Sequence, residues 1–415
     1  GAEVVPFENN SIEGSNSVLE RDWNRYLEDV ARANKLICNI DLVTDNSLTT
    51  AERAQYKAEA KMFRAMVMFD MVRLWGDFPV ITTVADDITS ENIDEVYPQY
   101  FPKQNTELEA YQQIEKDLLD AVLYAPDNTP GNKTLFTKSV ARTLLAKIYA
   151  EKPLRDYTKV IQYCDEVKAD GFDLVDDFSD LFGMNAAGTD AKMRNTKESI
   201  LEAQFTSGAG NWCTWMFGRD LVNWNNNFTW AKWVTPSRDL ISAFKQEGDE
   251  VRFKESIVYY DCNWSNYYPS DNYPFMYKCR SANSSIIKYR YADVLLLKAE
   301  ALIMQDTPDL EGAADIIDKV RDRAKLGALP TSVRSNKNAM LNALLKERRF
   351  ELAFEGQRWF DLVRLDKVEE VMNAVYAKDS GRKAQIYTFD KNSYRLPIPQ
   401  SVIDANDKIH QNPGY

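Results

Sequence analysis

The strongest constraint on the fold is a helical spacing of apolar residues that recurs on both sides of a long middle stretch. Between Glu52 and Trp75, apolar residues return every three or four positions, which is the spacing of one face of an α-helix. Gly76 and Pro79 follow directly, as expected where such a helix ends. The residues of this face are Met62, Ala65, Met66, Phe69 and Val72.

The same spacing returns elsewhere and predicts a mainly α fold. Adjacent segments are joined by short connections, which favours antiparallel helical hairpins of tetratricopeptide type. Cys38 and Cys164 lie within such segments, and we expect them to be small core residues. The segments with this spacing are 18–42, 105–123, 137–152, 156–168, 292–303, 310–320 and 341–352.

The composition changes twice along the chain, and we expect one composite domain over residues 1–415 with three parts. Residues 1–172 form an N-terminal helical part and residues 289–415 a C-terminal helical part. Residues 173–288 are rich in Gly, Asn, Trp and Tyr, and they predict long loops with short strands. Within this middle part we expect a strand near 198–205 and a short helix that begins with Thr235 as N-cap and Pro236 at its first position.

Charge and residue counts exclude several functional classes. The net charge of −12 repels phosphate backbones, so nucleic acid is not an expected partner. The single histidine, His410, has no ligand pattern around it, and we expect no catalytic residue, no metal site and no cofactor. Five cysteines lack CxxC spacing, although Cys262 and Cys279 could form a disulfide in an oxidising compartment.

Six of the nine tryptophans fall between positions 212 and 264, interleaved with asparagines and tyrosines. The C–H face of a pyranose stacks on a flat aromatic ring, while its hydroxyl groups need amide or charged partners. The stretch therefore predicts a glycan-binding site, although irregular loops also bury aromatic residues as core. The predicted ligand-binding residues are Trp212, Trp215, Trp224, Trp230, Trp264, Asn211, Asn225 and Arg219, with Trp233 expected in the core.

Two longer motifs and three shorter ones occur in an order typical of one protein family. Residues 59–65 read EAKMFRA and lead to LWGDFP at 74–79, and residues 347–364 read ERRFELAFEGQRWFDLVR. Shorter matches are YRYADVLLLKA at 289–299, LPIP at 396–399 and QNPGY at 411–415. The chain resembles the SusD/RagB family of outer-membrane nutrient-binding lipoproteins, the starch-utilisation-system type, over most of its length.

This resemblance implies a SusD-like scaffold of four TPR-like helical hairpins with a loop-rich variable region. It also implies a cell-surface protein of the outer membrane that binds oligosaccharide or polysaccharide and delivers it to a SusC-like TonB-dependent transporter. Family members contact the membrane only through a lipid anchor on a cysteine, and the segment that would carry it does not appear in this sequence. No enzymatic activity is expected.

The strongest family motif is interpreted as structural. Glu347, Glu351 and Glu355 recur every four residues, and Arg348, Arg349, Arg358 and Arg364 lie nearby. Carboxylates packed beside guanidinium groups form ion pairs that fix helix registry, so we expect ion pairs rather than a metal or acid–base site. We further expect Gly356 to allow a turn, with Trp359, Phe360 and Trp75 in the core.

Three alternatives to a glycan receptor stay open at this point. A peptide-binding outer-membrane receptor of the RagB type would also use an aromatic, Asn-rich cleft. A purely protein-binding TPR scaffold would use its concave helical surface. A glycoside hydrolase would need two carboxylates across a cleft, for which Asp220, Asp261 and Asp271 are available near the aromatic residues.

Overall fold

Long helices with capped ends build the N-terminal part. A computed structural model describes residues 3–206, 210–211, 234–262, 265–378 and 387–415. Thr49 and Glu52 form a reciprocal capping box at the start of α3 (Thr50–Trp75), which ends at Gly76 with a φ of 76°. The other elements of this part are α1 (Val5–Asn9), α2 (Ser17–Asn39), α4 (Ile93–Val96), α5 (Glu107–Tyr124), α6 (Lys138–Ala150), α7 (Tyr157–Ala169), η1 (Ile40–Leu42), η2 (Tyr97–Tyr100) and η3 (Lys152–Leu154).

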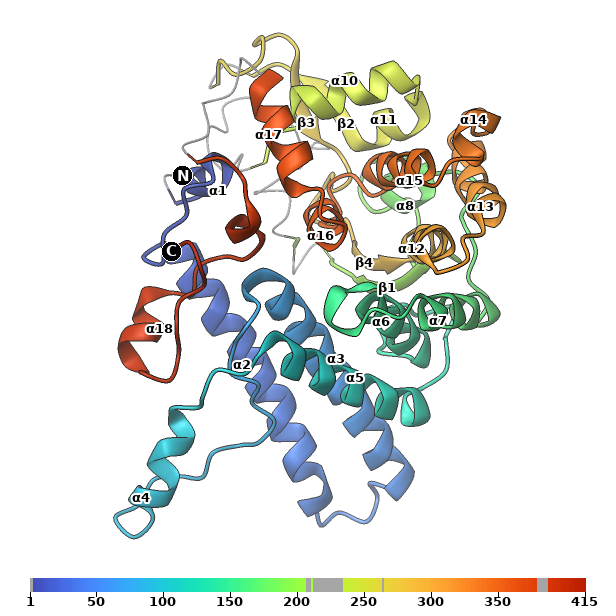
Figure 1. Ribbon diagram of the computed structural model, residues 1–415. Helices are drawn as coiled ribbons and strands as arrows, with labels where there is room; N and C mark the ends of the chain where they lie inside the picture. The colour runs from blue at the N-terminus through green and yellow to red at the C-terminus, as the bar shows by residue number, and fades with distance from the viewer. Residues whose placement is uncertain (1–2, 207–209, 212–233, 263–264, 379–386) are drawn as a thin grey trace.

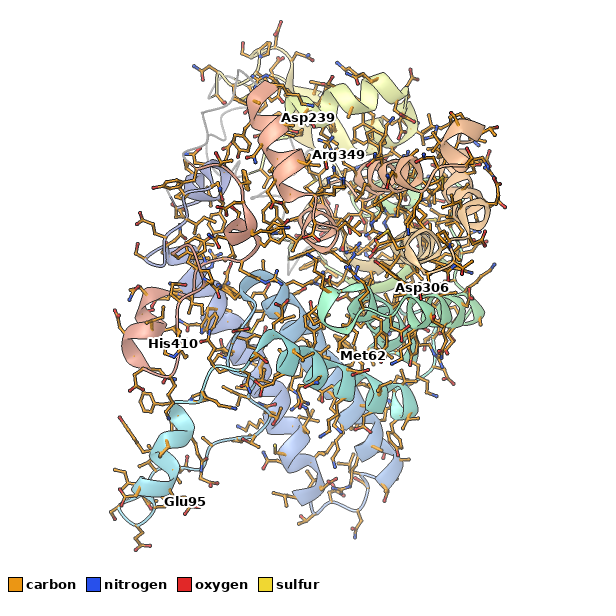
Figure 2. All side chains as sticks on the ribbon, viewed as in Figure 1. Met62, Glu95, Asp239, Asp306, Arg349 and His410 are labelled. Atoms are coloured by element: carbon orange, nitrogen blue, oxygen red, sulfur yellow. The ribbon has the colours of Figure 1, made fainter. Side chains whose placement is uncertain are left out.

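The long helices of this part pack against one another in the order of the sequence. α2 packs on α3, α3 on α5, α5 on α6, and α6 on α7 (Figure 1). Met62, labelled in Figure 2, is fully buried in the core that these helices share. Trp75 is buried too, with its ring edge-on to Trp23 at a centroid distance of 5.3 Å. The predicted helices and the core position of Trp75 are confirmed.

The described residues of the middle part form short strands and short helices separated by irregular loops, as predicted. β1 (Ser199–Ala203) pairs antiparallel with β4 (Ile286–Arg290), and β2 (Ile257–Tyr260) pairs antiparallel with β3 (Tyr273–Met276). The remaining helices here are α8 (Ser179–Phe182), α10 (Arg238–Glu247) and α11 (Glu250–Ser256). The predicted strand near 198–205 is confirmed as β1.

The start of α10 differs from the prediction by two residues. Ser237, not Thr235, is the N-cap, because its side chain accepts a hydrogen bond from the backbone N–H of Leu240 at 3.1 Å. Pro236 therefore precedes the helix instead of opening it. At α6, Thr137 occupies the N-cap position, and its side chain makes no capping hydrogen bond.

The C-terminal part continues the helical frame, and α12 (Tyr291–Met304) joins it to the N-terminal part. α12 is buried along most of its length and contacts α6 and α7 as well as α13 and α15. A helix that is apolar on nearly all sides belongs in the interior. The other elements are α13 (Leu310–Arg323), α14 (Thr331–Arg334), α15 (Lys337–Glu351), α16 (Arg358–Arg364), α17 (Val368–Lys378), η4 (Lys391–Tyr394) and α18 (Gln400–Ala405).

The segment around α18 folds back onto α2 and α3, which form the first hairpin of the chain. The indole Nε1 of Trp75 donates to the carbonyl of Pro397 at 3.1 Å. The side-chain amide of Asn412 donates to the carbonyls of Trp75 at 2.7 Å and Leu396 at 2.8 Å. The LPIP and QNPGY motifs thus hold the C-terminal end of α3 in place.

Several cysteine and aromatic predictions need correction. Cys164 is buried as expected, but Cys38 is exposed because it lies on the outer face of α2. Cys262 is a buried free thiol, so the disulfide with Cys279 is not formed. Trp359 and Phe360 are half-buried rather than core residues. Within the described ranges, no helix combines the length and the apolar character needed to cross a membrane.

Candidate functional site

A buried network of charges surrounds the three glutamates of the strongest motif. Glu347 accepts a hydrogen bond from Arg252 at 2.6 Å, and Glu351 accepts one from Arg290 at 2.6 Å. Glu351 also pairs with Arg323 and, at 3.2 Å, with Arg252. Glu355 lies in the turn after α15, where it accepts from Lys278 at 2.6 Å and from Arg290 at 2.8 Å. The prediction that these glutamates form ion pairs is confirmed, but their partners are not the arginines of the same motif.

The arginines of the motif pair with other acids. Arg348 donates to Asp293 at 2.8 Å and to Asp361 at 2.8 Å, and Arg364 donates to Glu300 at 2.6 Å. Arg349 of α15 pairs with Asp239 of α10, and both are labelled in Figure 2. Arg358 donates instead to the carbonyl of Leu345 at 3.0 Å. These contacts tie α10, α12, α15 and α16 together.

Electrostatics make the network structural, not catalytic. Burial alone would raise the pKa of Glu351, but Arg323, Arg290 and Arg252 together outweigh it and hold that pKa well below its usual range. The side chain is inaccessible to solvent, so it cannot reach a substrate. Burial lowers the pKa of Lys278 to about 8 despite the nearby Glu355 carboxylate. An ionised, fully paired and enclosed carboxylate offers neither a proton nor a nucleophile.

A hollow between α10 and the β2–β3 hairpin has an open, aromatic wall. We refer to it as the α10 hollow; its volume is about 550 Å³, and the rings of Tyr259 and Tyr268 line it. Both rings are half-buried because they pack on the apolar face of α10. Burial raises the pKa of Tyr259, so its hydroxyl stays protonated and able to donate. The other lining residues are Arg238, Ile241, Ser242, Lys245, Gln246, Pro269 and Asn272.

Direct contacts fix the aromatic wall of the α10 hollow. The Tyr268 hydroxyl donates to the carbonyl of Pro236 at 2.6 Å. The Arg238 guanidinium lies 3.9 Å from the ring centroid of Tyr267 and 4.6 Å from that of Tyr268. The rings of Tyr267 and Tyr268 meet edge to face, with their centroids 4.9 Å apart. These contacts hold the Tyr268 ring in place beside the amide groups of Gln246 and Asn272, and such a combination of aromatic and polar groups suits a sugar ring.

Most predicted ligand-binding residues lie outside the described residues, namely Trp212, Trp215, Trp224, Trp230, Trp264, Asn225 and Arg219, as does Trp233. Asn211 is described and is buried. Its side-chain amide donates to the carbonyl of Ser284 at 2.8 Å, and its backbone N–H donates to the carbonyl of Ala282 at 2.7 Å. Asn211 thus anchors one end of the Trp-rich stretch.

The sequence predicted an aromatic binding region in the middle part, but none of the residues that line the α10 hollow was among the predicted ligand-binding residues. Tyr259 and Tyr268 extend the aromatic cluster of the middle part. Arg238, Lys245 and Gln246 were not singled out, although their three- and four-residue spacing with Ser242 places them on one face of α10. An amphipathic short helix beside an aromatic cluster was the available signal.

No described residue that lines the α10 hollow carries a carboxylate. Of the three carboxylates near the aromatic residues, Asp261 and Asp271 are exposed, and Asp220 lies outside the described residues. Across the described ranges, no group of three His, Cys, Asp or Glu side chains is placed to hold a metal ion. His410 is exposed, and its backbone N–H donates to Gln104 at 2.9 Å (Figure 2).

Comparison with known families matches both ends of the chain. A model of the SusD family matches residues 271–415, and a second model, described as starch-binding associating with outer membrane, matches residues 3–150. The chain is 27% identical to SusD-like protein P2 of Formosa agariphila over 449 aligned positions, which cover 96% of this chain and 81% of that protein.

Solved structures share the fold at low sequence identity. A laminarin binding SusD-like protein superposes with a TM-score of 0.74 at 23% identity and covers 100% of this chain and 90% of its own. Surface glycan-binding protein A from Bacteroides thetaiotaomicron, solved with laminarihexaose, superposes with a TM-score of 0.73 at 19% identity and covers 94% and 85% of the two chains. The mainly α, SusD-like architecture is therefore confirmed.

Proposed function

Because the chain belongs to the SusD/RagB family, we propose that it is a non-enzymatic glycan-binding protein of the outer-membrane surface. In this role a lipid anchor holds it at the membrane, and it delivers oligosaccharide or polysaccharide to a SusC-like TonB-dependent transporter. The laminarin and laminarihexaose named for two structural relatives support carbohydrate as the ligand class. The helical parts 1–172 and 289–415 act as the frame, and part 173–288 holds the ligand.

The observation that carries this proposal is the open tyrosine wall of the α10 hollow. Each sugar face stacked on an aromatic ring contributes roughly 1–2 kcal/mol. Two or three stacked units then give dissociation constants of order millimolar to tens of micromolar. Such affinities suit a receptor that has to release its cargo. We propose that Trp212, Trp215, Trp224, Trp230 and Trp264, with Asn211, Asn225 and Arg219, belong to the same binding region.

Titration of oligosaccharides into Tyr259→Ala tests the proposal. Tyr259 lines the α10 hollow, so its removal should weaken binding about tenfold, the loss of one stacked face. Tyr56→Ala is the matched control, because Tyr56 is a 41% exposed tyrosine of α3, far along the chain from the middle part. The α10 hollow is not a glycan site if the two variants bind glycan as tightly as the unaltered protein. Release of reducing ends during the titration would contradict the absence of enzymatic activity.

Peptide is the second candidate cargo, and one feature favours it. Lys245 lines the α10 hollow, and its ammonium group makes no ion pair among the described residues. An acidic side chain or a C-terminal carboxylate of an extended peptide would find a partner there. A peptide library assayed beside the glycans separates the two classes, because Lys245→Ala should weaken acidic peptides and leave neutral sugars unchanged.

A further inference from the structure

A second hollow lies where the two ends of the described chain meet. We refer to it as the terminal hollow; residues 10–14, 387–393 and 400–415 contribute to its wall, and its volume is about 600 Å³. Figure 1 shows α1 and both chain ends on this side of the molecule. The Asn10 side chain donates to the carbonyl of Tyr387 at 3.1 Å, and the backbone N–H of Gln400 donates to the carbonyl of Gly14 at 2.9 Å. The wall segments are thus fixed to one another by direct hydrogen bonds.

Several polar side chains of this wall have no side-chain partner among the described residues. Ser11, Glu13, Thr388 and Asn392 make no side-chain hydrogen bond or ion pair with any residue that the structure describes. Together they present hydroxyl, carboxylate and amide groups, which supply both donors and acceptors. Sugar hydroxyl groups need this mixture, since each one donates and accepts at once.

Two aromatic rings complete the terminal hollow. Tyr387 is 63% exposed and Tyr415 is 43% exposed. The hydroxyl of Tyr415 donates to the carbonyl of Arg395 at 2.9 Å, which orients the ring. Gly414 has a φ of 94°, and a Cβ atom there would lie 2.7 Å from the Cβ of Asn392, so the C-terminal tail lies directly against the wall. An oriented ring beside unpaired polar groups can stack on a pyranose face.

The charges of the two hollows are opposite in sign. The terminal hollow contains the carboxylates of Glu13 and Asp390, and none of its described lining residues is Lys, Arg or His. The α10 hollow contains Arg238 and Lys245 and no acidic lining residue among those described. In a protein of net charge −12, an anionic ligand meets repulsion at the terminal hollow from both near and distant charges.

We propose that the terminal hollow is a second saccharide subsite, one that selects neutral sugars and excludes uronate and sulfated ones. This subsite rests on the glycan-binding function proposed above and adds a selectivity to it. The α10 hollow tolerates acidic sugars, whereas the terminal hollow does not. A neutral glycan can therefore occupy two places on the protein, and an acidic glycan only one.

Isothermal titration with neutral and acidic hexasaccharides tests this selectivity. The probes are laminari-, malto-, cello-, xylo- and mannohexaose, with hexagalacturonate as the acidic member. Tyr387→Ala removes a mostly exposed ring and should weaken binding of the neutral hexasaccharides about five- to twentyfold without changing hexagalacturonate binding. Glu13→Lys reverses a charge that no described residue pairs, and it should strengthen hexagalacturonate binding about threefold or more. Tyr124→Ala, at a 54% exposed tyrosine of α5, is the control.

The outcomes separate failure of the subsite from failure of the function. If Tyr387→Ala and Tyr124→Ala bind neutral sugars equally well while Tyr259→Ala loses affinity, the terminal hollow is not a subsite and the glycan function stands. If Glu13→Lys leaves hexagalacturonate binding unchanged, the charge selectivity is wrong. If the unaltered protein binds none of the six probes, the subsite falls together with the glycan function that it rests on.

Discussion

Glu351 lies at the centre of the buried ion-pair network, and its replacement should lower the free energy of unfolding strongly. Glu351→Gln keeps the size of the side chain and removes its charge. One oxygen of Glu351 accepts from Arg290 and Arg323, and the other accepts from Arg252. The glutamine amide would keep the first acceptor, but it would turn an N–H donor toward the Arg252 guanidinium, which also donates.

The magnitude follows from breaking a buried ion pair, which costs about 3–5 kcal/mol when one partner is removed. An unfolding entropy of about 2.1 cal/mol/K per residue gives about 0.9 kcal/mol/K for 415 residues. The melting temperature of Glu351→Gln should therefore fall by about 3–6 °C in differential scanning calorimetry at neutral pH. The variant should bind glycan unchanged while folded, since Glu351 is enclosed and far from solvent.

Glu311→Gln is the matched control. Glu311 also pairs with an arginine, Arg334 at 2.7 Å, but its side chain is 70% exposed. Exposed ion pairs contribute about 0–1 kcal/mol, so the melting temperature should change by no more than about 1 °C. The structural role of the buried network would be refuted if both variants melted within 1 °C of the unaltered protein.

Two further predictions concern the same frame. Burial lowers the pKa of Lys278 to about 8, below its unfolded value near 10.5. Between these two values the unfolded chain holds more protons than the folded one, so the free energy of unfolding should rise with pH there. Urea denaturation between pH 8 and 9.5 should show this free energy rising by up to about 1 kcal/mol per pH unit more steeply in the unaltered protein than in Lys278→Met. Equal slopes in the two proteins would contradict the lowered pKa of Lys278. Arg358→Ala should lower the melting temperature by about 1 °C, because it removes the hydrogen bond to the Leu345 carbonyl. The affinity of the variant for glycan should stay unchanged. Weaker binding at an unaltered melting temperature would contradict a structural role of Arg358.

Local patterns predicted the helices well, because their signals lie within a few residues. The apolar face of residues 52–75 and the glycine after it define α3 almost to the residue. Cys38 was misplaced because it was judged by its residue type, although it lies off the face of α2 that buries Leu19, Trp23, Val30 and Ala33. The start of α10 was misjudged because Thr235 and Ser237 are both good N-caps, and only the position of the chain decides between them.

Contacts between distant segments could not be predicted in the same way. Glu351 pairs with Arg252, Arg290 and Arg323, which lie 99, 61 and 28 residues away and come from three different elements. The motif showed that its glutamates needed cations, but nothing local selected these three over Arg348 or Arg358. The same limit applies to the α10 hollow. Its tyrosines belong to the aromatic cluster of the middle part, but only the fold brings Arg238 and Asn272 beside them.

The return of the C-terminal segment to Trp75 has a kinetic consequence. Pro397 and Asn412 hold the indole and the carbonyl of a residue that is made more than 300 positions earlier. The first hairpin therefore lacks these hydrogen bonds until the last stretch of polypeptide has been synthesised. Contacts across so many residues form slowly. In a chain shortened at its C-terminus, the end of α3 should stay uncovered and favour aggregation.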